Sequence, residues 1–260
     1  MKEENAQKMR LHEMNPLDRF SDRVEDYVKY RPSYPSDAIA SILSSLKTAA
    51  PVVADIGAGT GISSRLLAEL HNIRVIAIEP NAEMRQAAQT HRLIEFRDGT
   101  AEATNLADNE VDLVTCFQSF HWFNPELTLP EFHRILKPSG RLAVVWNIRD
   151  RHDEITAKYS SIVRKASNNH PGEKRSDAIK PFLQSPLFGN RRQSIFPYKQ
   201  MLNLAGLIGR AMSTSYIPKS GEAYEELLSD LQQLFESSCD ENGFVCLVYQ
   251  TEVYLGKPIY

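Results

Sequence analysis

The stretch VVADIGAGTGISSRLLAEL, Val52 to Leu70, decides the fold. It joins a short apolar run to a loop with glycines at positions 57, 59 and 61, and then to apolar residues at helical spacing. This succession predicts a strand, a tight loop and a helix. Glycine there lets the backbone approach a ligand closely. A phosphate, a dinucleotide and an adenosyl group are all candidate ligands for such a loop.

The bulk composition is that of an ordinary globular protein. The 260 residues are 42% hydrophobic and 24% charged, with a formal net charge of -3. No basic excess points to a nucleic-acid partner. No apolar run approaches the ~20 residues of a membrane span, and the start, MKEENAQKMR, is charged and unlike a secretory signal. We expect a cytoplasmic protein with no nucleic-acid or membrane partner; the oligomeric state stays open.

Cysteine and histidine spacing gives no sign of a metal site. Cys116, Cys239 and Cys246 form no CxxC pair and lie in apolar surroundings, which predicts reduced, buried thiols. The seven histidines show no HxxxH or HExxH spacing. We therefore expect no metal.

Strand-like and helix-like patterns alternate through the first part of the chain. The apolar runs VVADI, RVIAIE, LIEFR, VDLVTCF and RLAVVWN predict five strands. Helices are expected after a Ser36 N-cap, from about Gly61, after an Asn81 cap, and over 127–137 with a stop at LKPSG. This alternation predicts an α/β fold with a doubly wound, mostly parallel sheet that binds ligands at the carboxyl ends of its strands.

The pattern changes after residue 150. Residues 151–190 are polar and mainly helical, and two further helices are split by SYIPKSG. RRQSIFPY and GFVCLVYQTEVYLG are two late strands, expected to end the sheet as an antiparallel pair. We expect one domain over 1–260, with its core at 36–150, 190–200 and 243–256. An N-terminal arm at 16–35 and helical insertions at 151–189 and 201–238 would form a cap.

The residues around the glycine loop narrow the choice of ligand. The loop reads GxGxG, and Ile62 stands where a dinucleotide fingerprint has its third glycine. Asp55 precedes the loop, where a carboxylate suits a cationic amine better than a phosphate. Glu79 follows 22 residues after Gly57 and can accept both hydroxyls of a ribose. A ligand with an amine, a ribose and a base fits this order.

Four motifs in register resemble a known family. ADIGAGTG, AIEPNAEM, DGTAEATNLADNEVD and LKPSGRL, over about residues 50–148, are similar to those of class I S-adenosylmethionine-dependent methyltransferases. The flanking KYRPSYP and QSFHWF resemble, more narrowly, small-molecule members related to the trans-aconitate and ubiquinone/menaquinone methyltransferases.

The resemblance implies S-adenosylmethionine as cofactor and S-adenosylhomocysteine as product. It implies that the methionine part is surrounded by Asp55, Gly57, Ala58, Gly59, Thr60 and Gly61. Glu79 would take the ribose, and the adenine would lie near Pro80, Met84, Thr100, Ala101 and Glu102. Phe117 and Gln118 would face the methyl group or the methionine tail, and Tyr30 and Arg31 of the arm would contact the cofactor.

Acceptor contacts are expected from the arm, the strand ends and the cap, namely Tyr34, Trp122, Trp146, Asn147, Arg149 and Tyr216. His121 could act as a general base or as a hydrogen-bonding wall residue. Arg31 and Arg149 favour a carboxylate.

The resulting prediction is S-adenosylmethionine-dependent methyl transfer to a small soluble acceptor, an acid or another oxygen nucleophile. The alternatives are a nicotinamide-dependent oxidoreductase and a regulator that binds the cofactor without catalysis.

Overall fold

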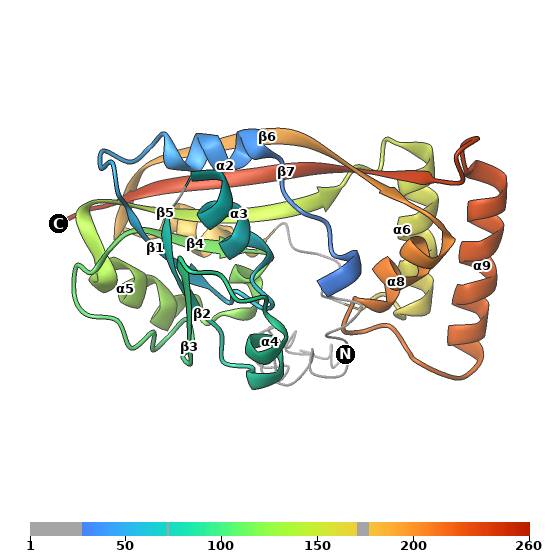
Figure 1. Cartoon of the computed structure of the whole chain (residues 1–260), viewed down its shortest axis with the longest axis horizontal. Helices are drawn as coiled ribbons and strands as arrows, with labels where there is room; N and C mark the ends of the chain where they lie inside the picture. The colour runs from blue at the N-terminus through green and yellow to red at the C-terminus, as the bar shows by residue number, and fades with distance from the viewer. Residues whose placement is uncertain (1–27, 72, 171–176) are drawn as a thin grey trace, which may run out of the picture.

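A single twisted sheet runs through the molecule and carries the strand ends that form the site (Figure 1). The computed structural model describes residues 28–71, 73–170 and 177–260. Their strands follow the order β3-β2-β1-β4-β5-β7-β6. The bounds are β1 Val52–Ile56, β2 Arg74–Ile78, β3 Ile94–Arg97, β4 Val111–Phe117, β5 Leu136–Arg149, β6 Phe188–Leu202 and β7 Val245–Pro258.

The direction of the strands agrees with the sequence. Pairs among β1 to β5 are parallel, whereas β7 pairs antiparallel with both β5 and β6. The chain order reverses between β1 and β4, so the two strands send their following loops to opposite faces. A crevice forms at such a switch point in doubly wound sheets. The expected α/β class and the antiparallel end of the sheet are both confirmed.

Helices cover both faces of the core sheet because neighbouring strand residues point to opposite sides. In β1, Val53 packs in the apolar cluster that holds α2 (Ser36–Leu43) and α3 (Ile62–His71). Ala54 and Ile56 pack in the cluster on the other face, which holds α5 (Pro125–Ile135) and α7 (Lys180–Gln184). The short α4 (Ala82–Ala87) follows β2, with Asn81 capping it as predicted.

A third cluster builds a helical cap at the far end of β6 and β7 (Figure 1, right). It consists of α6 (Glu154–Ala166), α8 (Leu204–Met212) and α9 (Glu222–Ser238), packed on the strand ends. Tyr159 and Tyr249 are among its fully buried side chains. The cap uses the predicted insertions, although the exact domain extents stay a prediction.

Three local expectations were wrong. Helix α2 begins at Ser36 itself, with Pro35 as its N-cap, whereas Ser36 was expected to be the cap. Helix α5 begins at Pro125, because Asn124 caps it and proline fits the first helical turn. It ends at Ile135, since the segment expected to stop it is already extended and begins β5. Cys239 is exposed rather than buried, because it lies just past the end of α9.

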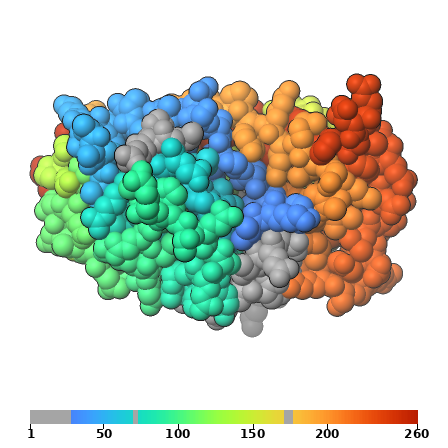
Figure 2. Space-filling view, in the orientation of Figure 1, coloured from blue at the N-terminus to red at the C-terminus, as the bar shows by residue number. Residues whose placement is uncertain are grey.

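The described part of the arm lies between the core and the cap (Figure 2). A guanidinium nitrogen of Arg31 donates to the carbonyl of Ser213 at the end of α8, at 2.7 Å. The ring of Tyr30 lies so close to Gly209 of α8 that a Cβ there would stand 2.1 Å from a ring carbon. The arm is therefore seated on the cap; residues 16–27 of the predicted arm lie outside the described residues.

Two further hydrogen bonds fix the arm to the sheet. The Asn147 amide, at the end of β5, donates to the Ser33 carbonyl at 2.8 Å. The Gln200 amide, in β6, donates to the Tyr30 carbonyl at 3.0 Å. The arm thus holds the cap and the strand ends together.

Gly209→Ala should lower the melting temperature, because the new methyl group would displace the Tyr30 ring, at a cost of about 1–3 kcal/mol for overpacking. Gly206→Ala in the same helix is the control, since its Cβ would meet its nearest neighbour at 3.1 Å. Thermal unfolding measures both. In a Tyr30→Ala background, Gly209→Ala should instead stabilise the helix by roughly 1 kcal/mol. Destabilisation that persists in that background would show that the arm is not seated on Gly209.

Candidate functional site

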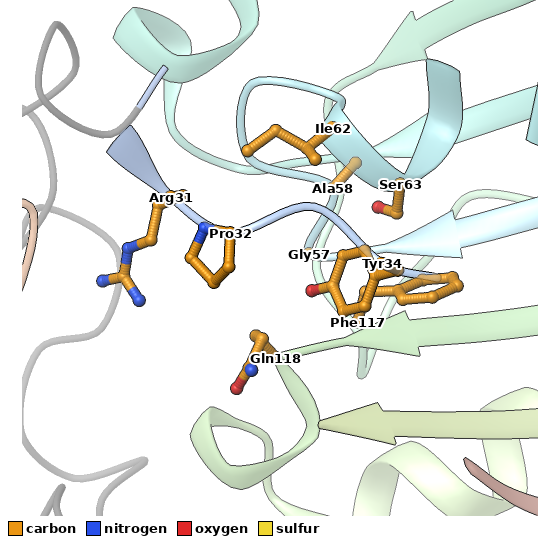
Figure 3. A pocket seen from close by; sticks show the side chains of 9 residues that line it. All are labelled: Arg31, Pro32, Tyr34, Gly57, Ala58, Ile62, Ser63, Phe117 and Gln118. Atoms are coloured by element: carbon orange, nitrogen blue, oxygen red, sulfur yellow. The ribbon is translucent and has the colours of Figure 1, made fainter. Parts of the chain in front are cut away.

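A pocket lies at the carboxyl ends of β1 and β4, beneath the arm (Figure 3). Three segments line it: the arm, the glycine loop with the first turn of α3, and the end of β4. The lining residues are Arg31, Pro32, Tyr34, Gly57, Ala58, Ile62, Ser63, Phe117 and Gln118. The edge of the Tyr34 ring packs against Phe117 with ring centroids 4.7 Å apart. The pocket therefore joins residues that lie far apart in the sequence.

The glycine loop needs its glycines for conformation and for space. Gly57, Gly59 and Gly61 have φ values of +67°, +58° and +79°, which side chains disfavour. A Cβ on Gly57 would stand 2.7 Å from the Ser119 Cβ, and one on Gly61 would stand 2.8 Å from the Phe96 ring. The loop thus differs from an ordinary turn, because Ser119 and Phe96 pack too closely against it to leave room for a side chain.

Asp55 lies beneath this loop rather than at its mouth. The carboxylate is fully buried and accepts hydrogen bonds from the hydroxyls of Ser63 and Ser64, both at 2.7 Å, and Thr115 at 2.8 Å. Burial raises the pKa of Asp55 above 3.8, and the three hydroxyl donors oppose that rise. Asp55 therefore ties β1 to α3 and to β4; its contact with the cofactor stays a prediction.

Glu79 reaches back from the end of β2 to the glycine loop. One carboxylate oxygen accepts from the Gly59 amide at 2.8 Å, and the other accepts from the Asn81 amide at 3.0 Å. Each oxygen has a further lone pair to offer a ligand hydroxyl. Burial raises the pKa of Glu79 above 4.5, although these amides and the nearby Arg85 favour the ionised form. The carboxylate and the loop form one unit.

The polar groups of the loop suit a cofactor with an amino acid part and a ribose. The Thr60 hydroxyl is buried and has no hydrogen-bond partner among the described residues. An unfilled buried hydroxyl costs free energy unless a ligand or water pairs with it. Together with the free acceptor capacity of Glu79, it fits S-adenosylmethionine, as the resemblance implies.

Gln118 ends β4 in a strained conformation. Its φ is +55°, which is rare for a residue with a long side chain. Its amide donates to the Asn147 carbonyl at 3.1 Å, and its backbone amide donates to the Val145 carbonyl at 2.9 Å. Strain of this kind is retained where a side chain must be aimed. Here it places Gln118 in the wall of the pocket, next to Phe117.

The residues expected near the adenine follow β2 and β3. Met84 and Ala101 are buried, and Pro80 is half-buried. Thr100 closes a turn by accepting from the Ala103 amide at 3.2 Å. Glu102 accepts from the Asn124 amide at 2.9 Å, at the start of α5. One carboxylate oxygen of Glu102 is therefore engaged in the fold, and the adenine contacts stay predictions.

His121 and Trp146 pack together beneath the strand ends. The indole nitrogen of Trp146 donates to Nδ1 of His121 at 3.3 Å, and both side chains are buried. Because an indole can only donate, Nδ1 must accept, which places the proton of a neutral ring on Nε2. A base with this tautomer would have to give up the Trp146 bond before taking a proton. Trp122 lies tilted against the ring, with centroids 4.9 Å apart.

The remaining predicted acceptor residues lie toward the cap. The side-chain nitrogen of Asn147 donates to the Ser33 carbonyl, and its side-chain oxygen Oδ1 accepts from the Thr251 hydroxyl at 2.6 Å. The guanidinium of Arg149 lies 5.4 Å from the centre of the Tyr159 ring. Tyr216 stacks on His170 at 4.6 Å. Asn147 is thus committed to the fold, Arg149 contacts Tyr159 of the cap, and Tyr216 lies within the cap.

Sequence reasoning missed Pro32, Ile62 and Ser63 in the pocket wall. A usable signal was present for Ser63, because two successive serines open the helix directly after the loop and can donate to the acid before it.

The described ranges hold neither a candidate metal cluster nor a candidate membrane-spanning helix. No cluster of three or more His, Cys, Asp or Glu side chains there could hold a metal ion. Within the same ranges, no helix has the length and apolar character needed to cross a membrane.

The chain is similar to known methyltransferases in sequence. Residues 54–144 match the family model described as a methyltransferase domain. An uncharacterised methyltransferase-like protein of Schizosaccharomyces pombe is 32% identical over 249 residues, which cover 94% of this chain and 97% of that protein. The ubiquinone/menaquinone biosynthesis C-methyltransferase of Rubrivivax gelatinosus is 37% identical over 94 residues, 34% of this chain and 36% of that protein.

The fold has solved counterparts. A protein of Anaeromyxobacter dehalogenans, described as a type II methyltransferase, superposes with a TM-score of 0.65 at 18% identity, covering 88% of this chain and 98% of that one. At this identity the likeness concerns the fold.

Glu79→Gln should weaken S-adenosylhomocysteine binding at least tenfold, about 1.4 kcal/mol, because a neutral amide accepts hydroxyls less strongly. Isothermal titration calorimetry from pH 5 to pH 8 measures it. Because the Glu79 pKa is raised and the ionised form binds hydroxyls, wild-type affinity should fall as pH drops toward that pKa, already above 4.5. The variant should lack this dependence. Glu83→Gln, an exposed change nearby, should match the wild type; a pH profile unchanged by Glu79→Gln would remove Glu79 from the site.

Gly59→Ala should reduce S-adenosylhomocysteine binding strongly while the protein stays folded, because φ is +58° and its amide holds Glu79. Gly243→Ala is the matched control, since Gly243 has φ +76° in a turn with no atom near its Cβ position. Both should lose roughly 1 kcal/mol of stability. If both variants bind equally well, the loop does not act as a cradle.

Proposed function

The chain belongs to the S-adenosylmethionine-dependent methyltransferases, and we propose that it methylates an oxygen atom of a small, soluble, acidic acceptor. The observation that carries this proposal is the arm, which lies over the strand ends and is hydrogen-bonded to both cap and sheet. An enclosed site excludes water and suits a small ligand. A protein or nucleic-acid acceptor would need an open face.

Residues of this chain would hold the cofactor as follows. The glycine loop and Thr60 would contact the methionine part, Glu79 would accept the ribose hydroxyls, and Gln118 would lie beside the reacting centre. When bound, the cofactor supplies a methyl group on a positively charged sulfur. Tyr34 and Phe117 line the pocket with aromatic rings, which attract such a cation.

A carboxylate acceptor needs no general base. An acceptor oxygen forms a bond to the methyl carbon while the carbon–sulfur bond breaks, and the electron pair of that bond stays on sulfur. A carboxylate becomes an ester and releases no proton. Alignment of the two centres can supply up to ~7–11 kcal/mol of the barrier reduction. The hydrogen bond that Trp146 makes to His121 supports a positioning role for that histidine rather than general-base catalysis.

The two alternative functions carry less support. The methyltransferase relatives and the family match leave no place for nicotinamide chemistry. A regulator that binds the cofactor without catalysis would share the glycine loop and the Glu79 carboxylate, but the methyltransferase relatives favour an enzyme. An incubation with labelled methyl donor and a pool of metabolites, followed by identification of the labelled product, tests the proposal. Gly59→Ala is the inactive control.

Arg149→Met should raise KM for the identified acceptor about tenfold and leave KM for the methyl donor unchanged, because Arg149 stands on the cap side of the strand ends. Arg141→Met, in the first half of the same strand and beside Leu113 of β4, is the control. Steady-state kinetics with each substrate varied measure both. The proposed acceptor class would be contradicted if Arg149→Met left KM for the acceptor unchanged. It would also be contradicted if the best acceptor proved to be RNA or a protein side chain.

A further inference from the structure

Two carboxamide side chains of the sheet donate to backbone carbonyls of the arm. Asn147, near the end of β5, donates to the Ser33 carbonyl at 2.8 Å, and Gln200, in β6, donates to the Tyr30 carbonyl at 3.0 Å. Three arm residues beside these carbonyls line the pocket, namely Arg31, Pro32 and Tyr34 (Figure 3). The two hydrogen bonds therefore hold the segment that covers the pocket.

Hydroxyl groups of β7 orient both carboxamides. The Thr251 hydroxyl donates to the Asn147 side-chain oxygen at 2.6 Å, and the Tyr249 hydroxyl donates to the Gln200 side-chain oxygen at 3.2 Å. Because a carbonyl can only accept, each arm carbonyl requires the nitrogen of its carboxamide, which leaves the oxygen for a hydroxyl. Tyr249 also accepts from Arg210 of α8 at 3.3 Å, so its own proton remains for Gln200. The same arrangement of carbonyl, carboxamide and hydroxyl thus occurs twice.

Asn147 also joins the arm to a second wall of the pocket. Its backbone carbonyl accepts from the Gln118 side chain at 3.1 Å, and Gln118 lines the pocket at the end of β4. Asn147 is 7% exposed, and the side chain of Thr251 that orients it is fully buried. One residue of β5 therefore sets the position of the arm relative to the end of β4.

We propose that Asn147 and Gln200 are positioning residues that hold the arm closed over the cofactor, and that cofactor exchange requires both of their bonds to the arm to open. The inference rests on the proposed function, because the ligand beneath the arm would be the cofactor. Each bond contributes modestly to stability, since water replaces it when the arm opens. The pair can therefore open reversibly, and a covering segment of this kind sets the rates of binding and release.

The test measures how fast S-adenosylhomocysteine binds and leaves, by surface plasmon resonance on the full chain. Asn147→Asp and Gln200→Glu keep the size of each side chain and the oxygen that accepts from its hydroxyl. At pH 8 the new carboxylates place an oxygen without a proton against the arm carbonyl, and the arm should open. The association and dissociation rate constants should both rise at least tenfold, so the dissociation constant should change less than either.

A matched control makes the same chemical change away from the arm. Gln193 also lies in β6, but its side chain donates to the Tyr254 hydroxyl. Gln193→Glu should therefore bind and release S-adenosylhomocysteine at the wild-type rates.

The hydroxyl that orients Asn147 separates positioning from stability. Thr251→Val removes that hydroxyl and should raise both rate constants, whereas Thr251→Ser keeps it and should restore the wild-type values. If the hydrogen bonds served fold stability alone, Thr251→Val would lower the melting temperature and leave both rate constants unchanged.

Three results would overturn the proposal or its premise. Unchanged rate constants in folded Asn147→Asp and Gln200→Glu would overturn it. A dissociation rate constant that rises alone would overturn it too, because the carboxamides would then hold the ligand rather than the arm. If Asn147→Asp does not fold, Gln200→Glu carries the test, because Gln200 is only half-buried. A wild type that binds no S-adenosylhomocysteine would instead defeat the proposed function itself.

Discussion

The Asp55 carboxylate is the interaction on which the rest of the site depends. Its three hydroxyl donors come from α3 and β4. One side chain of β1 therefore fixes the glycine loop relative to α3 and β4. The positive backbone angles of the loop can persist because both of its ends are held. Glu79 then reaches the Gly59 amide from the next strand. Asp55 thus supports the loop from within the fold, whereas Glu79 is held at the loop by the Gly59 amide and is the acid that we propose to bind the ligand.

The sequence was sufficient for the fold and for several residues that line the pocket beside the glycine loop. Short apolar runs alternating with helical spacing predict a parallel sheet, and glycines between a strand and a helix mark its ligand edge. The Val- and Tyr-rich run at the end correctly indicated a strand. Its position between β5 and β6 could not be read in the same way, since it depends on pairing across more than 100 residues of chain.

The acceptor side was harder to predict because partners there are remote in sequence. Asn147 holds Ser33, 114 positions away, and Trp146 holds His121, 25 positions away. A strand-end residue can face a pocket or a neighbour, and the sequence does not say which. The burial of Arg210 could not be predicted for a related reason. In LIGRAM it resembles a charged residue on the outer face of a helix, and only the helix rotation in the folded chain turns it inward.

The two longest strands have a mechanical consequence. β6 and β7, of 15 and 14 residues, run from the sheet into the cap and are paired without a register shift from Arg192 onward (Figure 1). A hydrogen-bonded pair of strands resists bending. The helices at its end therefore do not move on a hinge as a separate domain would. We therefore expect ligands to enter and leave the pocket past residues 30–34, which hydrogen bonds from Asn147 and Gln200 hold to the sheet. The paired strands set the distance between sheet and cap, and residues 30–34 bridge the two.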